Sequence, residues 1–326
     1  MDSTTNIVSV IIPVYNSSLL LKRSIESVYI QKTNYKIELI IIDDGSEDDI
    51  NQIISLYPQI KFSTQKNSGP AAARNNGLEM ATGKYVSFLD ADDYWKPGFL
   101  KETIHFLNNN TEAIAVSVGQ IHKFPRRDDL TIPAFLKNPS SEIKQSMLLD
   151  NFYEFWSKNN HVCTGSVLMR TELVKKTKGQ RVDLRITEDI EFWAYLATFG
   201  KWGFIPKILF VSDGGKITRQ QGWQEKNRAR WASATNMEDW ESRIIQTIPD
   251  HLFTSYQKAR GRIAKRLAYS MILSGRGNQA KTMVHKYGAY FPGDRMSKIL
   301  KFASKSPVTW IIICNLVVIK ESNRKL

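Results

Sequence analysis

The stretch KYVSFLDADD, residues 84–93, decides the fold class, because it joins an apolar strand to a group of acids. A continuous apolar and β-branched run of this length suits a strand that is covered on both faces, as in a parallel sheet. Two other runs have the same character, VSVIIPV at Val8–Val14 and IELIIID at Ile37–Asp43. The three runs therefore predict strands of one buried sheet.

The segments between these runs have helical patterns. Leu19–Ile30 carries apolar residues near a spacing of 3.6, and Pro70–Met80 is rich in alanine. Another helix is expected after Ser46, a plausible N-cap that is followed by three acids. This alternation predicts an α/β fold with a doubly wound, mostly parallel, Rossmann-like sheet and right-handed crossovers.

Polar motifs follow all three strands. They are PVYN at Pro13–Asn16, DDGS at Asp43–Ser46 and DADD at Asp90–Asp93. In sheets of this kind, ligands bind at the carboxyl ends of the strands. Three carboxylates within four residues repel one another unless a cation joins them, so the sequence predicts a ligand site at this edge.

The rest of the chain continues the pattern and then changes. We expect a helix from Phe99 to about residue 110, a long loop over residues 121–160, and a helix that Thr187 caps. Further strands are expected at residues 113–118, 164–169 and 207–213. From Trp223 the pattern is helical and basic, with breaks at Pro249, Gly275 and Pro292. The domain boundaries predicted from this change are 1–215 for the α/β domain and 216–326 for a helical C-terminal extension.

Composition narrows the classes of partner. The net charge of +13 is concentrated in the second half of the chain and favours anionic partners, although a solvated basic face explains it equally well. The two cysteines have no metal-ligand spacing, and the N-terminal sequence lacks the marks of a signal peptide. The apolar run Trp310–Ile319 has about half the ~20 residues of a spanning helix, so it suits a core segment or an interfacial anchor.

The quoted motifs, with TED at Thr187–Asp189, resemble glycosyltransferase family 2 over roughly residues 5–215. The resemblance implies a GT-A fold and an inverting transfer of sugar from a nucleotide diphosphate donor, with UDP-sugar as the expected donor. It also implies a divalent cation, Mn²⁺ or Mg²⁺. Hard oxygen ligands such as the DADD carboxylates suit either ion.

The resemblance also implies roles for single residues. Asp92, with Asp90, binds the cation. Asp189 is the base that deprotonates the acceptor hydroxyl. The expected donor-binding residues are Pro13, Tyr15, Asn16, Asp43, Asp44, Arg74, Asp90 and Asp92. Ordinary structural roles compete with these: Asp-Gly is a common turn, and acids such as Glu188 and Asp189 favour the first turn of a helix.

The acceptor predicted from these features is a glycan or a lipid-linked intermediate of surface polysaccharide biosynthesis. We expect the enzyme to be cytoplasmic and peripheral on the inner face of the cell membrane, because basic helices are attracted to anionic lipids. No nucleic acid is expected as a partner. Two alternatives stay open, a nucleotidyltransferase and a non-catalytic protein that binds an anionic partner.

Overall fold

The structure is a computed structural model that describes residues 6–124, 127–131, 143, 145–213 and 223–322. The chain forms two compact units. The first contains residues 1–152, 159–182 and 188–217, and the second contains residues 153–158, 183–187 and 218–326.

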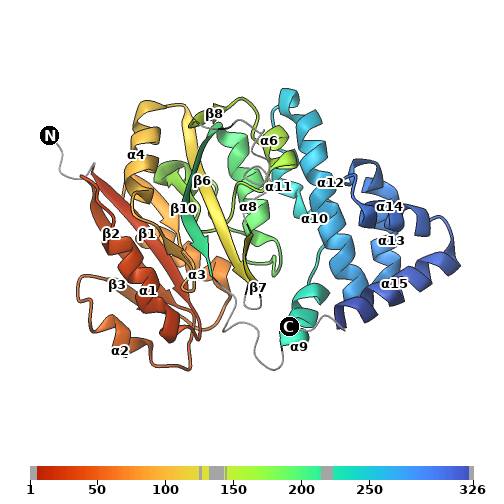
Figure 1. Ribbon diagram of the computed structural model, residues 1–326, viewed down its shortest axis with the longest axis horizontal. Helices are drawn as coiled ribbons and strands as arrows, with labels where there is room; N and C mark the ends of the chain where they lie inside the picture. Colours follow the sequence, from red (N-terminus) through yellow and green to blue (C-terminus); the bar gives the residue numbers. More distant parts are fainter. Residues whose placement is uncertain (1–5, 125–126, 132–142, 144, 214–222, 323–326) are drawn as a thin grey trace. The chain divides into compact units, whose positions relative to one another are not determined.

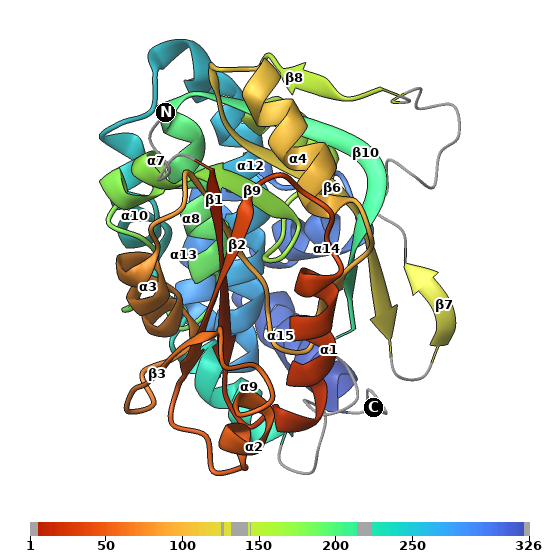
Figure 2. The ribbon, with the colours of Figure 1, turned by 90° about the vertical axis from the view of Figure 1, so that its left-hand side faces the viewer.

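The first unit is built on a ten-stranded sheet with the order β3-β2-β1-β4-β9-β6-β10-β5, in which β7 also pairs with β6 and β8 with β10 (Figure 2). The strands are β1 Ile7–Val14, β2 Lys36–Asp43, β3 Lys61–Thr64, β4 Tyr85–Phe88, β5 Tyr94–Trp95, β6 Ala113–Phe124, β7 Arg127–Thr131, β8 Met147–Leu149, β9 Val167–Arg170 and β10 Lys201–Ser212. Strands β1 to β4 are parallel, as are β6 and β10, while β9 lies antiparallel between β4 and β6. The predicted α/β fold with a mostly parallel sheet is confirmed.

Helices pack on both faces of the central strand β1. The helices of this unit include α1 Ser18–Tyr29, α2 Ile50–Ile54, α3 Pro70–Met80, α4 Phe99–Asn109, α7 Thr171–Lys176 and α8 Glu188–Leu196 (Figure 1). Alternate β1 residues such as Val8 and Val10 share a core with Leu21 of α1. On the other face α3 approaches closely, because a Cβ at Gly77 would lie 2.4 Å from Cγ2 of Ile11. A residue larger than glycine would separate α3 from the sheet.

The expected loop over residues 121–160 is wrong for the residues described there. Strand β6 continues to Phe124 and forms an antiparallel hairpin with β7, and β8 pairs with β10. Helix α6, Phe152–Lys158, follows. The β7 sequence, RDDLT, has no apolar run, and β7 pairs with β6 outside the main order of the sheet.

Two expected helix caps differ from the structure. Helix α2 begins at Ile50, and Asp49 rather than Ser46 caps it, by accepting a hydrogen bond from the Gln52 backbone N–H at 3.2 Å. Thr187 does precede α8, but its φ of 63° lies outside the extended region usual for an N-cap. Its hydroxyl accepts a hydrogen bond from Nε1 of Trp240 at 3.0 Å.

The last strand begins six residues before the predicted start at Lys207, since β10 runs from Lys201. Its pairing with β6 shifts register between Ile205 and Ile208. Pro206, which has no N–H to donate to the ladder, lies at this irregularity. Because of this proline, the sequence pattern does not show that the strand is continuous.

The second unit is helical, as the sequence predicts from Trp223 onward. Its helices are α9 Trp223–Ala232, α10 Met237–Trp240, α11 Ser242–Ile245, α12 Asp250–Leu273, α13 Gly277–Tyr287, α14 Arg295–Ala303 and α15 Pro307–Ser322. Buried Glu241, between α10 and α11, links this part of the unit to α12. It pairs with Arg260 and accepts a hydrogen bond from the Tyr256 hydroxyl at 2.8 Å. Among the described residues, no helix is both long enough and apolar enough to cross a membrane.

Candidate active site

The carboxyl ends of the central strands meet at one edge of the sheet, as predicted. Val14 at the end of β1 pairs in register with Asp43 at the end of β2, and Ile11 pairs with Phe88 of β4. The Asp44 backbone N–H donates to the Val14 carbonyl at 2.8 Å, and that of Leu89 donates to Ile11 at 2.9 Å. The DDGS and DADD segments therefore begin on either side of β1.

The loops after β1 and β2 are tied together by hydrogen bonds. The Asp43 carboxylate accepts from the Ser46 N–H at 2.9 Å, and the Ser46 hydroxyl accepts from the Asn16 N–H at 3.0 Å. Asn16, held at a positive φ of 48°, accepts through its side chain from the Glu47 N–H at 2.8 Å. Beside this network Pro13 is buried, while the Tyr15 side chain is 46% exposed. The network fixes the backbone from which Tyr15 projects.

Asp44 is buried and makes three internal hydrogen bonds. Its carboxylate accepts from the Gln65 side chain and from the backbone N–H groups of Ser68 and Gly69, each at 2.8 Å. These donors lie just before α3, so Asp44 fixes the backbone segment that leads into that helix. A contact between Asp44 and a nucleotide base remains a prediction.

The three carboxylates of the DADD segment have different surroundings. Asp90 forms an ion pair with Arg74 at 2.6 Å. Asp93 is buried and accepts from the Asp213 N–H at 2.9 Å, and burial with the charges of Asp90 and Asp92 raises its pKa well above the usual value. Burial, followed by the charge of Asp90, raises the pKa of Asp92 to about 6. Mutual repulsion of these acids is therefore present in the structure.

Arg74 connects the acidic segment with a second group of acids. Its guanidinium is 5% exposed and donates to Oδ1 of Asp90 and to Oε1 of Gln180, at 2.6 and 3.1 Å. Burial lowers the pKa of Arg74, but the charges of Asp90, Glu188 and Asp189 more than offset this and raise it. Arg74 is therefore a buried residue between two groups of acids, not a solvent-exposed helix residue.

Asp189 lies near the acidic segment, at the start of α8. Glu188 is 7% exposed, whereas Asp189 is half-buried. Burial, and then the charges of Asp93, Asp189 and Asp90, raise the pKa of the Cys163 thiol. The predicted base, Asp189, and the predicted cation ligand Asp90 therefore both influence Arg74 and Cys163.

Sequence reasoning missed Arg23 and Asp213, which hold the DADD segment. Arg23 of α1 pairs with Asp213 at 2.5 Å, donates to the Asp92 carbonyl at 2.6 Å and lies 4.8 Å from the centre of the Tyr94 ring. Ser24 donates to the Ala91 carbonyl at 2.8 Å. Asp213 follows the carboxyl end of β10, so the strand-end rule that selected the other acids could have found it.

The residues of this region fit a cation that would take some of its ligands from the protein and the others from a substrate. Within the described ranges, no group of three or more His, Cys, Asp or Glu side chains is arranged to hold a metal ion. Among the described side chains, no Lys or Arg forms an ion pair with the Asp92 carboxylate, whose pKa is raised by burial and by the charge of Asp90. Mg²⁺ is commonly held by one or two carboxylates together with substrate phosphates, and this donor set suits such a site.

The raised pKa of Asp92 predicts a pH-dependent stability difference in the metal-free protein. Between its ordinary pKa of 3.8 and the folded value of about 6, the folded state holds a proton that the unfolded state releases. The free energy of unfolding therefore falls as pH rises through this window. Asp92→Asn should raise the melting temperature by a few degrees near neutral pH, and the gain should shrink toward about pH 4. Scanning calorimetry in EDTA checks this, and a gain that grows on acidification would contradict it.

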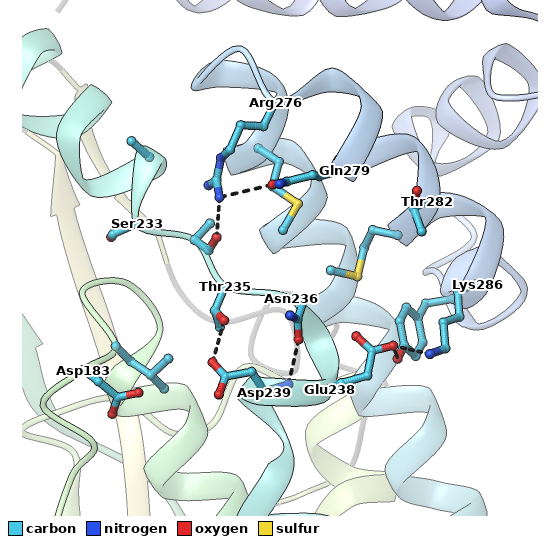
Figure 3. Close-up of a pocket in the computed structure, with 16 residues that line it drawn as sticks. Asp183, Ser233, Thr235, Asn236, Glu238, Asp239, Arg276, Gln279, Thr282 and Lys286 are labelled. Carbon is cyan, nitrogen blue, oxygen red and sulfur yellow. Dashed lines mark hydrogen bonds and ion pairs between the residues drawn. The ribbon is translucent and has the colours of Figure 1, made fainter.

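The second unit holds an open cavity of about 610 Å³ (Figure 3). Several of its polar groups bond one another: Arg276 donates to the carbonyls of Ala234 and Trp231 at 2.8 Å, and Lys286 pairs with Glu238. None of the residues predicted from the motifs lines this cavity. We therefore assign the candidate chemistry to the acidic region of the first unit.

Comparison with a family model identifies residues 9–177 as a glycosyl transferase family 2 domain. The chain is 32% identical to the Escherichia coli UDP-Glc:alpha-D-GlcNAc-diphosphoundecaprenol beta-1,3-glucosyltransferase WfaP over 197 residues, which is 60% of this chain and 71% of WfaP. Segments of 106 residues, 32% of this chain, are 42–46% identical to uncharacterized glycosyltransferases of three Rickettsia species. They span only 15–17% of those proteins.

Solved structures share the fold. The structure of S. aureus TarS 1–349 in complex with UDP-GlcNAc matches 97% of this chain and 91% of that chain, with a TM-score of 0.59 and 16% identity. A mannosyltransferase from Pyrobaculum calidifontis, in complex with GDP-Man and Mn²⁺, matches 96% of this chain and 87% of that chain, with a TM-score of 0.54 and 16% identity. At these identities the likeness shows the fold alone.

Proposed function

The chain belongs to glycosyltransferase family 2, and from this premise we propose that it transfers a sugar from a UDP-linked donor to a hydroxyl group of a lipid-linked or glycan acceptor, with inversion. The observation that carries the proposal is the convergence of Asp92, Arg74 and Asp189 in one region of the first unit. A displacement of this kind requires a base on one side of the sugar and a stabilised leaving group on the other. The region provides candidates for both.

On the donor side, Asp92 and Asp90 would hold a Mn²⁺ or Mg²⁺ ion shared with the donor diphosphate. Such an ion, when bound, neutralises charge on the departing diphosphate. Arg74 holds Asp90 at 2.6 Å, and Arg23 holds the backbone of Asp92, so these side chains set the positions of the two carboxylates before the donor arrives. Tyr15, Asn16 and Asp44 would contact the base, with Asp43 fixing the loop after β2 through the Ser46 N–H.

On the acceptor side, Asp189 would take the proton of the attacking hydroxyl. The acceptor oxygen then forms its bond to the anomeric carbon of the sugar while the bond from that carbon to the diphosphate breaks, and UDP departs. Asp189 is more exposed than Glu188, so it is the better placed of the two to reach an acceptor.

The choice of UDP and of a lipid-linked acceptor is supported by the relatives. WfaP is named for a UDP-Glc donor and a diphosphoundecaprenol-linked acceptor, and TarS 1–349 has been solved with UDP-GlcNAc. The basic second half of the chain suits an anionic lipid-linked acceptor at the inner face of the cell membrane, where we propose that the enzyme works as a cytoplasmic, peripheral protein.

Release of nucleotide diphosphate tests this function. The enzyme, with Mn²⁺ and a bacterial lipid extract as a mixture of acceptors, is offered UDP-, GDP- and dTDP-linked sugars in turn. We expect UDP release from one UDP-sugar, dependent on the extract and lost in Asp189→Asn. Release of GDP or dTDP instead would refute the UDP assignment, and release of none would refute the proposed transfer.

A further inference from the structure

The two last helices expose a concentrated apolar surface. Of the 15 large apolar side chains that are exposed in the described residues, six lie within residues 302–319. They are Phe302 (71% exposed), Val308 (66%), Ile311 (61%), Leu316 (54%), Ile319 (53%) and Ile312 (51%). Single exposed apolar residues are ordinary, but a contiguous group of this kind marks an interaction site.

These side chains share one face of α15. Residues 308, 311, 312, 316 and 319 follow the spacing of one helical stripe. The opposite side is fixed to the unit, because Trp310 and Val317 are 3% and 4% exposed and Nε1 of Trp310 donates to the Gly277 carbonyl at 2.9 Å. The exposed stripe is therefore not the face by which α15 packs.

An apolar groove of about 470 Å³ continues the stripe onto α14. Ile299, Phe302 and Ile312 line it, and Arg295 and Lys298 line it as well. Figure 1 shows α14 and α15 in blue within the second unit. We call the exposed stripe and this groove together the α14–α15 face.

Basic side chains outnumber acids along these two helices, where Asp294, paired with Lys265, caps α14 and Glu321 lies near the end of α15. Residues 295–320 contain five basic residues, namely Arg295, Lys298, Lys301, Lys305 and Lys320, and no Asp or Glu. A second copy of the chain would bring two such positive segments together, which is unfavourable. An anionic lipid surface instead complements both the charge and the apolar stripe.

We propose that the α14–α15 face docks the enzyme on an anionic lipid bilayer. The 16-residue α15 lies along the surface, with its exposed stripe at the boundary between headgroups and acyl chains. Arg295 and Lys298 lie against lipid phosphates. This docking would hold the enzyme where a lipid-linked acceptor resides. Its purpose therefore rests on the proposed function.

Co-sedimentation with vesicles tests the docking without any transfer reaction. The full chain should sediment with vesicles made of equal parts phosphatidylcholine and phosphatidylglycerol, should not sediment with pure phosphatidylcholine, and should be released by added salt. Arg295→Gln with Lys298→Gln should weaken binding about thirtyfold. Ile311→Asp with Leu316→Asp should weaken it at least about tenfold, since both apolar side chains leave the lipid.

Leu56→Asp is the matched control, because Leu56 is 60% exposed but lies in the first unit. It should bind vesicles like the unaltered protein, and so should Asp189→Asn, which separates docking from catalysis. Circular dichroism verifies that each variant folds. Equal binding to neutral and anionic vesicles, or no binding to either, would overturn the proposal. So would a dimer in solution that Ile311→Asp with Leu316→Asp dissociates, because a second copy would then cover the face.

Discussion

Asp92→Asn is expected to abolish sugar transfer while the protein remains folded. Among the described residues Asp92, like Asp93, forms no ion pair with a Lys or Arg side chain, and burial followed by the charge of Asp90 raises its pKa to about 6, so its carboxylate can supply negative charge to a cation. The amide can neither supply that negative charge nor bind a hard cation as well. Turnover measured by UDP release should therefore fall to background at every Mn²⁺ concentration.

A matched substitution separates this effect from a general loss of charge. Asp150 is exposed, also lies in the first unit, and is remote in sequence from the motifs. Asp150→Asn should leave turnover unchanged. If Asp92→Asn retained ordinary turnover, the assignment of the donor site to the DADD segment would be wrong.

Asp189→Asn should lower turnover by about 10²–10⁴-fold, the range expected for the loss of a general base. The substituted residue can no longer take the proton of the acceptor hydroxyl. Affinity for UDP should barely change, because Asp189 acts on the acceptor. Steady-state kinetics combined with a direct measurement of UDP binding reveals this separation of kcat from donor affinity.

Glu188→Gln is the neighbouring control. Glu188 is buried at the first position of α8 and influences Arg74, so its replacement should alter stability more than turnover. If Glu188→Gln lowered turnover more than Asp189→Asn does, Glu188 rather than Asp189 would be the base. If neither substitution affects turnover, these acids only begin a helix and the base lies elsewhere.

The sheet and the edge that carries the site could be predicted from local patterns. The apolar runs ending at Asp43 and Leu89 identify buried parallel strands, and the polar residues after them must emerge at one edge. The alanine-rich segment Pro70–Met80 likewise indicates a helix, whereas its close approach to the sheet at Gly77 is seen only in the structure. These inferences need only the spacing of apolar residues along the sequence and the polar residues that follow each strand.

Contacts between distant segments could not be predicted in this way. Arg23 and Asp213 are 190 residues apart, and Arg74 and Gln180 are 106 apart, so no periodic pattern links them. The polar strand β7 lacks an apolar run, and Pro206 interrupts the pattern of β10. The sequence shows that Trp310–Ile319 is apolar, but the structure shows which of its residues are exposed.

The central claim is that the DADD carboxylates join a cation to the donor diphosphate. Titration calorimetry of UDP into the unaltered protein, with Mn²⁺ and then with EDTA, tests it most directly, with Asp92→Asn measured alongside. The account predicts UDP binding that requires Mn²⁺ in the unaltered protein and is absent from Asp92→Asn under both conditions. UDP binding of equal strength in EDTA, or binding that Asp92→Asn preserves, would contradict it.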